Sequence, residues 1–276
     1  MKTIITASIV LYKNDFTALR DLLKSLSNKD NGIFIVYLID NSPTNFLSQL
    51  SSIKYLNVIY IHNIINTGFG SGHNIALEKA IEINSKYHFI INPDIRLSES
   101  VITRMITYIE LNENVGMMMP QILNFDGSVQ YLPKLLPTPF SIIFRKIKRP
   151  VKLYFKFISK YELRFVPNSV TYNAPVLSGC FTLLNLKCIQ EVGLYDDKFF
   201  MYFEDWDLSR RMHKKYKTIY FPQVSVFHGY DSGANKSAKL FKIFIKSYIA
   251  YFSKWGWFFD SERNNVNKAA LAQFNP

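Results

Sequence analysis

Along the first third of the chain, segments with the apolar pattern of buried strands alternate with segments of helical period. Apolar runs rich in β-branched residues, typical of parallel strands buried on both faces, lie at residues 3–12, 33–39, 58–61 and 89–91. Helical spacing begins after Asn14 and Asp15, either of which can cap a helix, and recurs over residues 74–83. Strands separated by helices predict an α/β fold with a parallel sheet and right-handed crossovers.

The later two thirds of the chain has a less regular pattern. A helix over residues 101–111 is followed by an apolar stretch, 115–123, and by Asp126-Gly127, a hairpin-turn signal. The remaining predicted elements are a strand at 181–186, a short helix at 188–192, a strand at 218–221 and a helix over 237–257.

In the last of these helices, lysines and apolar side chains occupy different faces. Lys239, Lys242 and Lys246 recur at spacings of three and four. The apolar face consists of Leu240, Phe241, Phe244, Ile245, Tyr248 and Phe252, and the segment ends in Trp255, Trp257, Phe258 and Phe259. Such a helix suits an anionic membrane interface. A helix packed on the core with its lysines in water explains the pattern equally well.

Polar residues and glycines gather where the predicted parallel strands end. In strand order they are Tyr12, Asp40, the glycine-rich turn 66–72 and the triplet 92–94. Ligands of open α/β sheets bind at the carboxyl ends of the strands. We therefore expect a binding site at this edge of the sheet.

The turn at residues 66–72 alternates glycine with other residues, at Gly68, Gly70 and Gly72. Glycines let backbone approach a ligand closely, and the helix N-terminus that follows favours anions. The spacing matches neither the dinucleotide fingerprint nor the P-loop, so the turn alone does not identify a ligand.

Asp94 and His228 are the candidate metal ligands. A carboxylate at the end of a strand can hold Mg²⁺ or Mn²⁺ together with a diphosphate, although Asn92-Pro93-Asp94 taken alone is more typical of a plain turn. His228 follows the apolar segment 224–227 and can be either a ligand or a structural hydrogen-bonding residue.

The segment 199–211 contains three carboxylates within four positions, wrapped in aromatic residues: Glu204, Asp205 and Asp207. They could begin a helix, with the first two in solvent and Asp207 paired to Arg210 or Arg211. Alternatively, they hold a metal, a proton or a substrate hydroxyl, because carboxylates beside so much apolar surface are otherwise costly.

Composition narrows the class of protein. With 276 residues, 48% of them hydrophobic, the chain suits one large domain or one and a half, with a sizeable core. Its net charge of +12 calls for a nucleic acid, an anionic lipid or a phosphorylated substrate. Residues 134–164 carry nine Lys or Arg against one acid, and form either a solvated surface segment or a membrane-surface segment.

Cys180 and Cys188 favour a reduced, cytosolic protein, and neither a signal peptide nor a membrane span is expected.

Taken in order, the motifs resemble those of inverting glycosyltransferases of family 2, which have the GT-A fold. The resemblance spans residues 3–230 and is strongest to bacterial rhamnosyltransferases of cell-surface polysaccharide (O-antigen type) biosynthesis. The segments that carry it are residues 8–12, 39–41, 66–70, 92–94, 178–181 and 200–208.

This resemblance assigns a role to each candidate residue. It places Tyr12 and Asp40 at the nucleobase and Asn66 with Gly68 in the nucleotide wall. Asn92 and Asp94 match the family's Asp-x-Asp motif, with Asp94 as the metal ligand and His228 as a late metal or diphosphate ligand. The divalent metal, Mg²⁺ or Mn²⁺, loses one anionic ligand because Asn92 replaces the first aspartate. Asp205 matches the general base, and Glu204 precedes it in a Glu-Asp pair.

The resemblance also implies an organisation and a set of partners. A GT-A domain covers residues 1–230, with a nucleotide-binding half (1–96), a basic insert (134–170) and an acceptor half (171–230), before a basic helical tail (231–276). The expected activity is transfer of L-rhamnose from dTDP-rhamnose to a lipid-linked, polyprenyl diphosphate saccharide. We expect a cytoplasmic protein, peripheral on the inner face of the cell membrane and in contact with anionic lipid.

Two alternatives remain at this point. A UDP-hexose donor would keep the enzyme class, because sequence motifs separate the two donors poorly. A non-enzymatic basic protein that binds lipid or nucleic acid would explain the charge, but no nucleic-acid motif is present and we expect no such partner.

Overall fold

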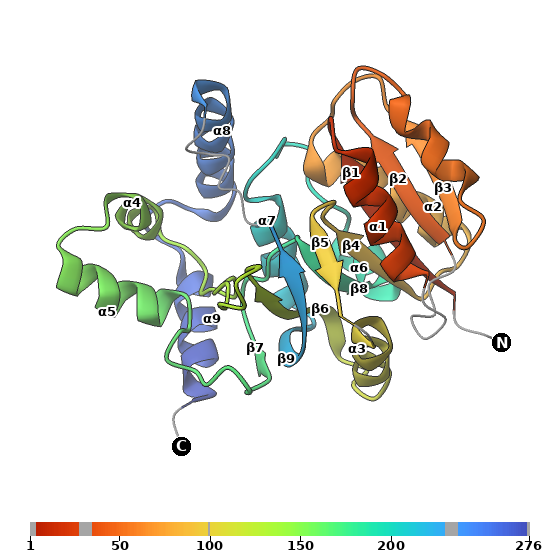
Figure 1. The fold of residues 1–276 in the computed structure, drawn as a ribbon. Coiled ribbons are helices and arrows are strands. Elements are labelled where there is room, and N and C mark those ends of the chain that lie inside the picture. Colours follow the sequence, from red (N-terminus) through yellow and green to blue (C-terminus); the bar gives the residue numbers. More distant parts are fainter. Residues whose placement is uncertain (1–3, 28–34, 99, 230–236, 275–276) are drawn as a thin grey trace.

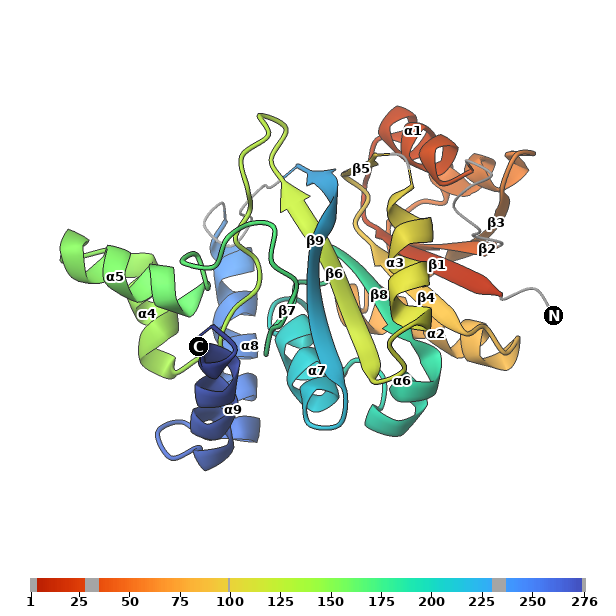
Figure 2. The ribbon, with the colours of Figure 1, turned by 90° about the horizontal axis from the view of Figure 1, so that it is seen from below.

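A computed structural model describes residues 4–27, 35–98, 100–229 and 237–274. Within these residues the strands form a single sheet in the order β3-β2-β1-β4-β8-β6-β9-β5, with β7 paired to β9. The strands are β1 (Ile5–Leu11), β2 (Ile35–Asp40), β3 (Asn57–His62), β4 (Tyr87–Ile91), β5 (Ile95–Leu97), β6 (Val115–Leu123), β7 (Tyr172–Asn173), β8 (Phe181–Asn185) and β9 (Lys217–His228). Helices cover both faces of this sheet (Figures 1 and 2).

The helices follow the chain between these strands. They are α1 (Phe16–Leu26), α2 (Phe69–Glu82), α3 (Val101–Glu110), α4 (Pro139–Ile147), α5 (Val151–Tyr161), α6 (Leu186–Val192), α7 (Glu204–His213), α8 (Ala238–Trp255) and α9 (Ser261–Ala272), with a 3₁₀ helix at Phe46–Ser52. Asp15 caps α1, since its Oδ1 accepts a hydrogen bond from the Ala18 N–H at 2.8 Å. The helix predicted over 74–83 begins five residues earlier, because the glycine-rich turn itself forms its first turn.

The predicted α/β fold with a parallel nucleotide-side sheet is confirmed. β3, β2, β1 and β4 are all parallel, so their carboxyl ends share one edge. Beyond β4 the sheet is mixed: β8 is antiparallel to β4 and to β6. This change of direction was not predicted, because β8 reaches β4 by a long excursion through α4 and α5 and not by a βαβ crossover. The unassigned apolar stretch at 115–123 is β6, paired in parallel with β9.

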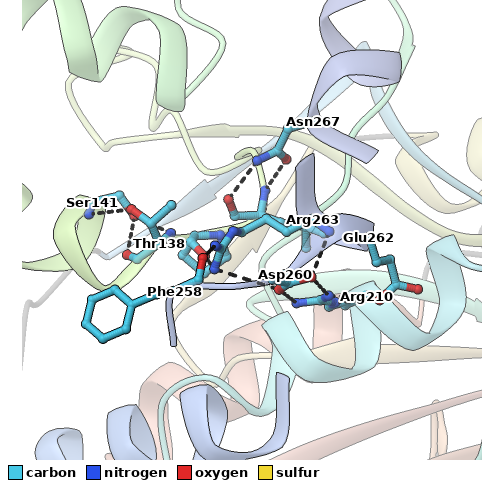
Figure 3. Close-up of polar contacts among 10 residues, drawn as sticks. Thr138, Ser141, Arg210, Phe258, Asp260, Glu262, Arg263 and Asn267 are labelled. Carbon is cyan, nitrogen blue, oxygen red and sulfur yellow. Dashed lines mark hydrogen bonds and ion pairs between the residues drawn. The ribbon is translucent and has the colours of Figure 1, made fainter. Parts of the chain in front are cut away.

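The basic insert forms two surface helices, α4 and α5, and the predicted helix at 237–257 is present as α8. A further helix, α9, was not predicted. Polar contacts hold α9 against the rest of the molecule (Figure 3): the Arg210 guanidinium of α7 donates to both Asp260 carboxylate oxygens, at 2.8 and 2.7 Å. Arg263 donates to the Pro137 carbonyl, and Asn267 exchanges two hydrogen bonds with the Leu136 backbone. Together these contacts also fix the chain just before α4.

Candidate active site

The ends of β1 and β2 present two different side chains. Tyr12 is about half exposed, and the Lys13 ammonium lies 5.6 Å from the centre of its ring. Asp40 is fully buried, with Oδ1 accepting from the Ser42 N–H at 2.9 Å and Oδ2 from the Tyr60 hydroxyl at 2.7 Å. Tyr12 is therefore open to a flat ligand, whereas a ligand reaches Asp40 only if the Tyr60 hydroxyl moves.

The glycine-rich turn packs directly against the segment that precedes α7. Gly68 has φ of +95°, and a Cβ placed there would lie 2.0 Å from the Phe200 carbonyl oxygen. The same oxygen accepts a hydrogen bond from the Phe69 N–H at 2.9 Å. Asn66 closes the turn by accepting from the Gly68 N–H at 3.0 Å. Only glycine fits this position, so the turn and the acidic segment form one structure.

Pairing between β4 and β8 brings the end of β4 to the acidic segment. Ile91 lies opposite Phe181, so the Asn92 N–H donates to the Cys180 carbonyl at 2.8 Å. One residue earlier, the Gly179 N–H donates to Asp205 Oδ2 at 3.1 Å. The triplet 92–94 and Asp205 therefore border the same short piece of backbone, although they lie more than a hundred positions apart in the sequence.

Backbone strain occurs directly before the carboxylates. Tyr202 and Phe203 both have positive φ, of 71° and 68°, a conformation that costs aromatic residues about 1–3 kcal/mol each. The rings of both residues pack on Phe244 of α8, at centroid distances of 5.7 and 5.5 Å. Helix α8 thus stabilises the turn that begins α7 at Glu204 and Asp205.

Glu204 and Asp205 have unusual protonation equilibria. Burial raises the pKa of Asp205 to about 6, against the opposing effect of hydrogen bonds from the Gly179 and Trp206 N–H groups. Burial, and then the Asp205 charge, raise the pKa of Glu204 well above its usual value. Near pH 7 we therefore expect Asp205 to be mostly ionised and Glu204 to hold its proton more strongly than an ordinary glutamate. The interpretation that places both side chains in solvent is wrong for Glu204, which is buried.

Lys134 is a residue of this site that the sequence did not single out. It is buried, its backbone pairs with Val176, and its ammonium donates to the carbonyls of Tyr131 and Leu132 at 3.2 and 2.8 Å. Burial lowers the pKa of Lys134 to about 8, an effect partly offset by attraction to Glu162 and Asp205. The same attraction opposes the rise in the pKa of Asp205. The only sequence signal was one lysine among the many of the basic insert.

Asn92, Asp94 and His228 lie together at the other side of the site. His228 Nε2 is 3.4 Å from Asp94 Oδ1 and accepts from the Asn92 amide at 3.2 Å. The His228 Nδ1–H donates to Gln130 Oε1 at 3.1 Å, which leaves Nε2 as the basic nitrogen facing Asp94. The β9 strand is longer than predicted and ends at His228, which explains this placement.

These three side chains are a donor set that suits a divalent cation. Asn92 Oδ1 is buried and has no hydrogen-bond partner among the described residues, so it is an oxygen donor that is not otherwise used. The Asp94 carboxylate, that amide oxygen and the His228 nitrogen are ligand types that Mg²⁺ or Mn²⁺ accepts. No group of three His, Cys, Asp or Glu suited to a metal occurs in the described part of the chain.

The side chain of Asp207 is occupied by hydrogen bonds and ion pairs that connect parts of the fold. It is fully buried and accepts from Arg211 Nε at 2.8 Å and from the Trp255 indole at 2.8 Å, while the Lys254 ammonium lies 2.7 Å away. The predicted pairing with an arginine is confirmed as Asp207–Arg211. Arg210 pairs instead with Asp260 and Glu262.

Comparison with known proteins adds a family and a fold. A family model described as glycosyl transferase family 2 matches residues 8–193. The chain is 25% identical over 245 residues to N-acetylglucosaminyl-diphospho-decaprenol L-rhamnosyltransferase of Mycobacterium tuberculosis, covering 84% of this chain and 78% of that protein. It is also 25% identical over 247 residues to rhamnosyltransferase WbbL of Escherichia coli, and the match covers 86% of this chain and 88% of that protein.

Another relative, the low-salt glycan biosynthesis hexosyltransferase Agl10 of Haloferax volcanii, is 25% identical over 209 residues. These residues are 75% of this chain, which spans only 61% of that protein's length. Among solved structures, GalNAc-T7 with UDP, GalNAc and Mn²⁺ has a TM-score of 0.66 at 13% identity, over 91% of this chain and 48% of that one. S. aureus TarS 1-349 with UDP has a TM-score of 0.60 at 11% identity, over 98% of this chain and 71% of that one. At these identities the likeness shows the GT-A fold alone.

Proposed function

Because this chain belongs to glycosyl transferase family 2, we propose that it transfers a sugar, with inversion, from a nucleotide sugar to a hydroxyl of a lipid-linked saccharide. The donor that we propose is dTDP-L-rhamnose. Two relatives named as rhamnosyltransferases support this sugar, and one of their names contains a decaprenol diphosphate acceptor. Cell-surface polysaccharide biosynthesis is the corresponding role.

The observation that carries this proposal is one carboxylate, Asp205, whose surroundings suit it to act as a general base. Asp205 keeps some accessible surface, has a pKa of about 6 and is oriented by the Gly179 and Trp206 N–H groups. A carboxylate of this kind takes the proton from an acceptor hydroxyl as its oxygen attacks the anomeric carbon. Glu204 is buried beside it, and its raised pKa disfavours a second ionised carboxylate in the pair that could act as a nucleophile, as retention would require.

The donor would lie along the carboxyl edge of the parallel strands. Tyr12 offers an open ring for the nucleobase, and the turn that contains Asn66 and Gly68 would form the neighbouring wall of the nucleotide site. Asp94 and His228, with the Asn92 amide oxygen, would hold a divalent cation, which would stabilise the negative charge of the leaving diphosphate. We propose that the enzyme acts in the cytoplasm at the inner face of the cell membrane. In the described residues no helix is both long and apolar enough to cross a membrane.

A UDP-hexose donor is the second candidate. It is favoured by the relative named as a hexosyltransferase. Nothing in the geometry of the Asp205 site separates a deoxyhexose from a hexose, so the two candidates share one mechanism.

A panel of nucleotide sugars tests the proposal. Thermal shift and release of nucleoside diphosphate would be measured for dTDP-rhamnose and UDP-sugars, with and without Mg²⁺ or Mn²⁺. We expect a selective response to dTDP-rhamnose that a metal strengthens. A selective response to a UDP-sugar would replace the donor, and no response from folded protein to any nucleotide sugar would refute the proposal.

A further inference from the structure

Two apolar stripes that are distant in the sequence lie on the outside of the molecule. Helix α4 exposes Phe140, Ile143 and Ile147 at helical spacing, and helix α8 exposes Phe241, Ile245 and Ile249 in the same way. Each of these side chains is between 37% and 65% exposed. In a monomeric protein, a continuous exposed apolar area marks a surface that binds something.

The two stripes are joined. The ammonium of Lys146 on α4 lies 5.3 Å from the ring centre of Phe241 and 4.2 Å from that of Phe244, both on α8. Ile142, from the inner side of α4, packs in the same apolar cluster as Tyr251 and Phe252 of α8. The basic insert and the helical tail therefore form one surface, at the end of the molecule away from β1–β3 (Figures 1 and 2).

The position of this surface is fixed by the fold. Arg263 and Asn267 of α9 hold the backbone just before α4, as Figure 3 shows. On its inner side, α8 contacts the turn before Asp205, where the Ser247 hydroxyl donates to the Met201 carbonyl at 2.8 Å. The outer surface is thus about one helix diameter, roughly 10 Å, from the turn that positions the base.

Charge on this surface selects its partner. Residues 138–161 contain seven Lys or Arg and no acid, and α8 adds the exposed Lys239, Lys242 and Lys246. Lys242 and Lys246 are exposed beside the α8 stripe, where long side chains can reach lipid phosphates while the apolar side chains enter the acyl region. A second copy of the chain would present the same positive charge and be repelled.

We propose that α4 and α8 together form a docking face for anionic phospholipid, which presents the Asp205 site to a lipid-linked acceptor at the membrane surface. The purpose of the face rests on the proposed function. Its binding to lipid does not, and the two can be tested separately.

The test is co-sedimentation with vesicles of phosphatidylcholine and phosphatidylglycerol, compared with phosphatidylcholine alone. The paired changes Ile143→Ser with Ile147→Ser, and Ile245→Ser with Ile249→Ser, should each weaken binding at least about tenfold. Lys242→Gln with Lys246→Gln should weaken it by roughly fivefold per lysine and reduce its salt dependence. Leu111→Ser, which changes an exposed leucine after α3, is the matched control and should bind like the wild type.

Failure to bind anionic vesicles, or equal binding by wild type and both serine pairs, would overturn the proposal. So would a wild-type dimer that the serine pairs dissociate without vesicles, because the face would then join two copies. Donor-induced thermal shifts, measured without vesicles, report on the transferase proposal separately. If no donor shifts the melting temperature while vesicle binding follows the expected pattern, the docking face stands and the transferase proposal fails.

Discussion

Asp205 and Asp207 lie two positions apart at the start of α7, yet the protein gives them opposite surroundings. Asp207 meets the cations of Arg211 and Lys254 together with the Trp255 indole. Asp205 meets two backbone N–H groups, and the charge of the buried Lys134 favours its ionised form. A buried carboxylate with few compensating groups keeps its affinity for a proton, which is the reason that the pKa of Asp205 is raised to about 6.

Within one short motif, the surroundings of Asp207 therefore suit a structural role, whereas those of Asp205 suit proton transfer. The ion pairs of Asp207 and Arg210 connect α7 to α8 and to the residues that begin α9. The surroundings of Asp205 connect it to Gly179 and, through that backbone, to the end of β4. Variants of the two regions should therefore differ in which property they change, stability or turnover.

The largest effect on stability is expected for Asp207→Asn. Removing a charge that meets two cations at a fully buried position should lower the free energy of unfolding by roughly 3 kcal/mol. Denaturant or thermal unfolding measures this, with the exposed Glu113→Gln as the matched control, expected to change it by less than about 0.5 kcal/mol. A loss of turnover without a loss of stability in Asp207→Asn would contradict the division between the regions.

The pH dependence of kcat/KM should follow Asp205. Its raised pKa means that the base is lost as the pH falls through about 6, so kcat/KM should drop about tenfold per pH unit below that point. The measurement is a pH–rate profile with folded protein verified at each pH. An acid limb near the ordinary carboxyl pKa of about 4 would show that burial does not control this group.

Lys134→Met should move this acid limb to higher pH. The substitution removes the cation that favours ionised Asp205, so the pKa of Asp205 should rise further. Lys160→Met, at an exposed position of the same basic insert, is the control and should leave the limb in place. A lower kcat with an unmoved limb would indicate that Lys134 only supports the fold.

The smallest effect is expected for Glu204→Gln. Burial and the Asp205 charge raise the pKa of Glu204 well above its usual value, so its neutral form is favoured. The amide should therefore leave kcat within about tenfold of wild type and the acid limb unchanged. Loss of activity on the scale expected for removing the base would mean that Glu204 is ionised and takes part in proton transfer.

Local pattern was sufficient to predict the nucleotide side of the molecule. The four parallel strands follow from apolar runs, and the convergence of Tyr12, the glycine-rich turn and Asp94 follows from strand polarity alone. The roles of these residues stay predictions. The helical spacing of apolar and basic residues in α8 was also evident in the sequence. That spacing alone did not decide whether the helix binds a membrane.

The features of the structure that the sequence did not predict depend on contacts between residues that are distant in the chain. The antiparallel β8, the buried Lys134 and the junction of α4 with α8 all depend on partners distant in the chain. Helix α9 has few apolar residues in any period, and its contacts include the pairing of Asp260 with Arg210, which lies fifty positions earlier. No local signal could have supplied these pairings.

Asp205→Asn tests the central claim most directly. The single-turnover rate of sugar transfer at saturating donor should fall at least about a hundredfold. Donor-induced thermal shift should persist, and stability near neutral pH should be equal or higher, because a carboxyl whose folded pKa is raised destabilises the fold once it ionises. Near-wild-type transfer by this variant would contradict the account and remove Asp205 as the base.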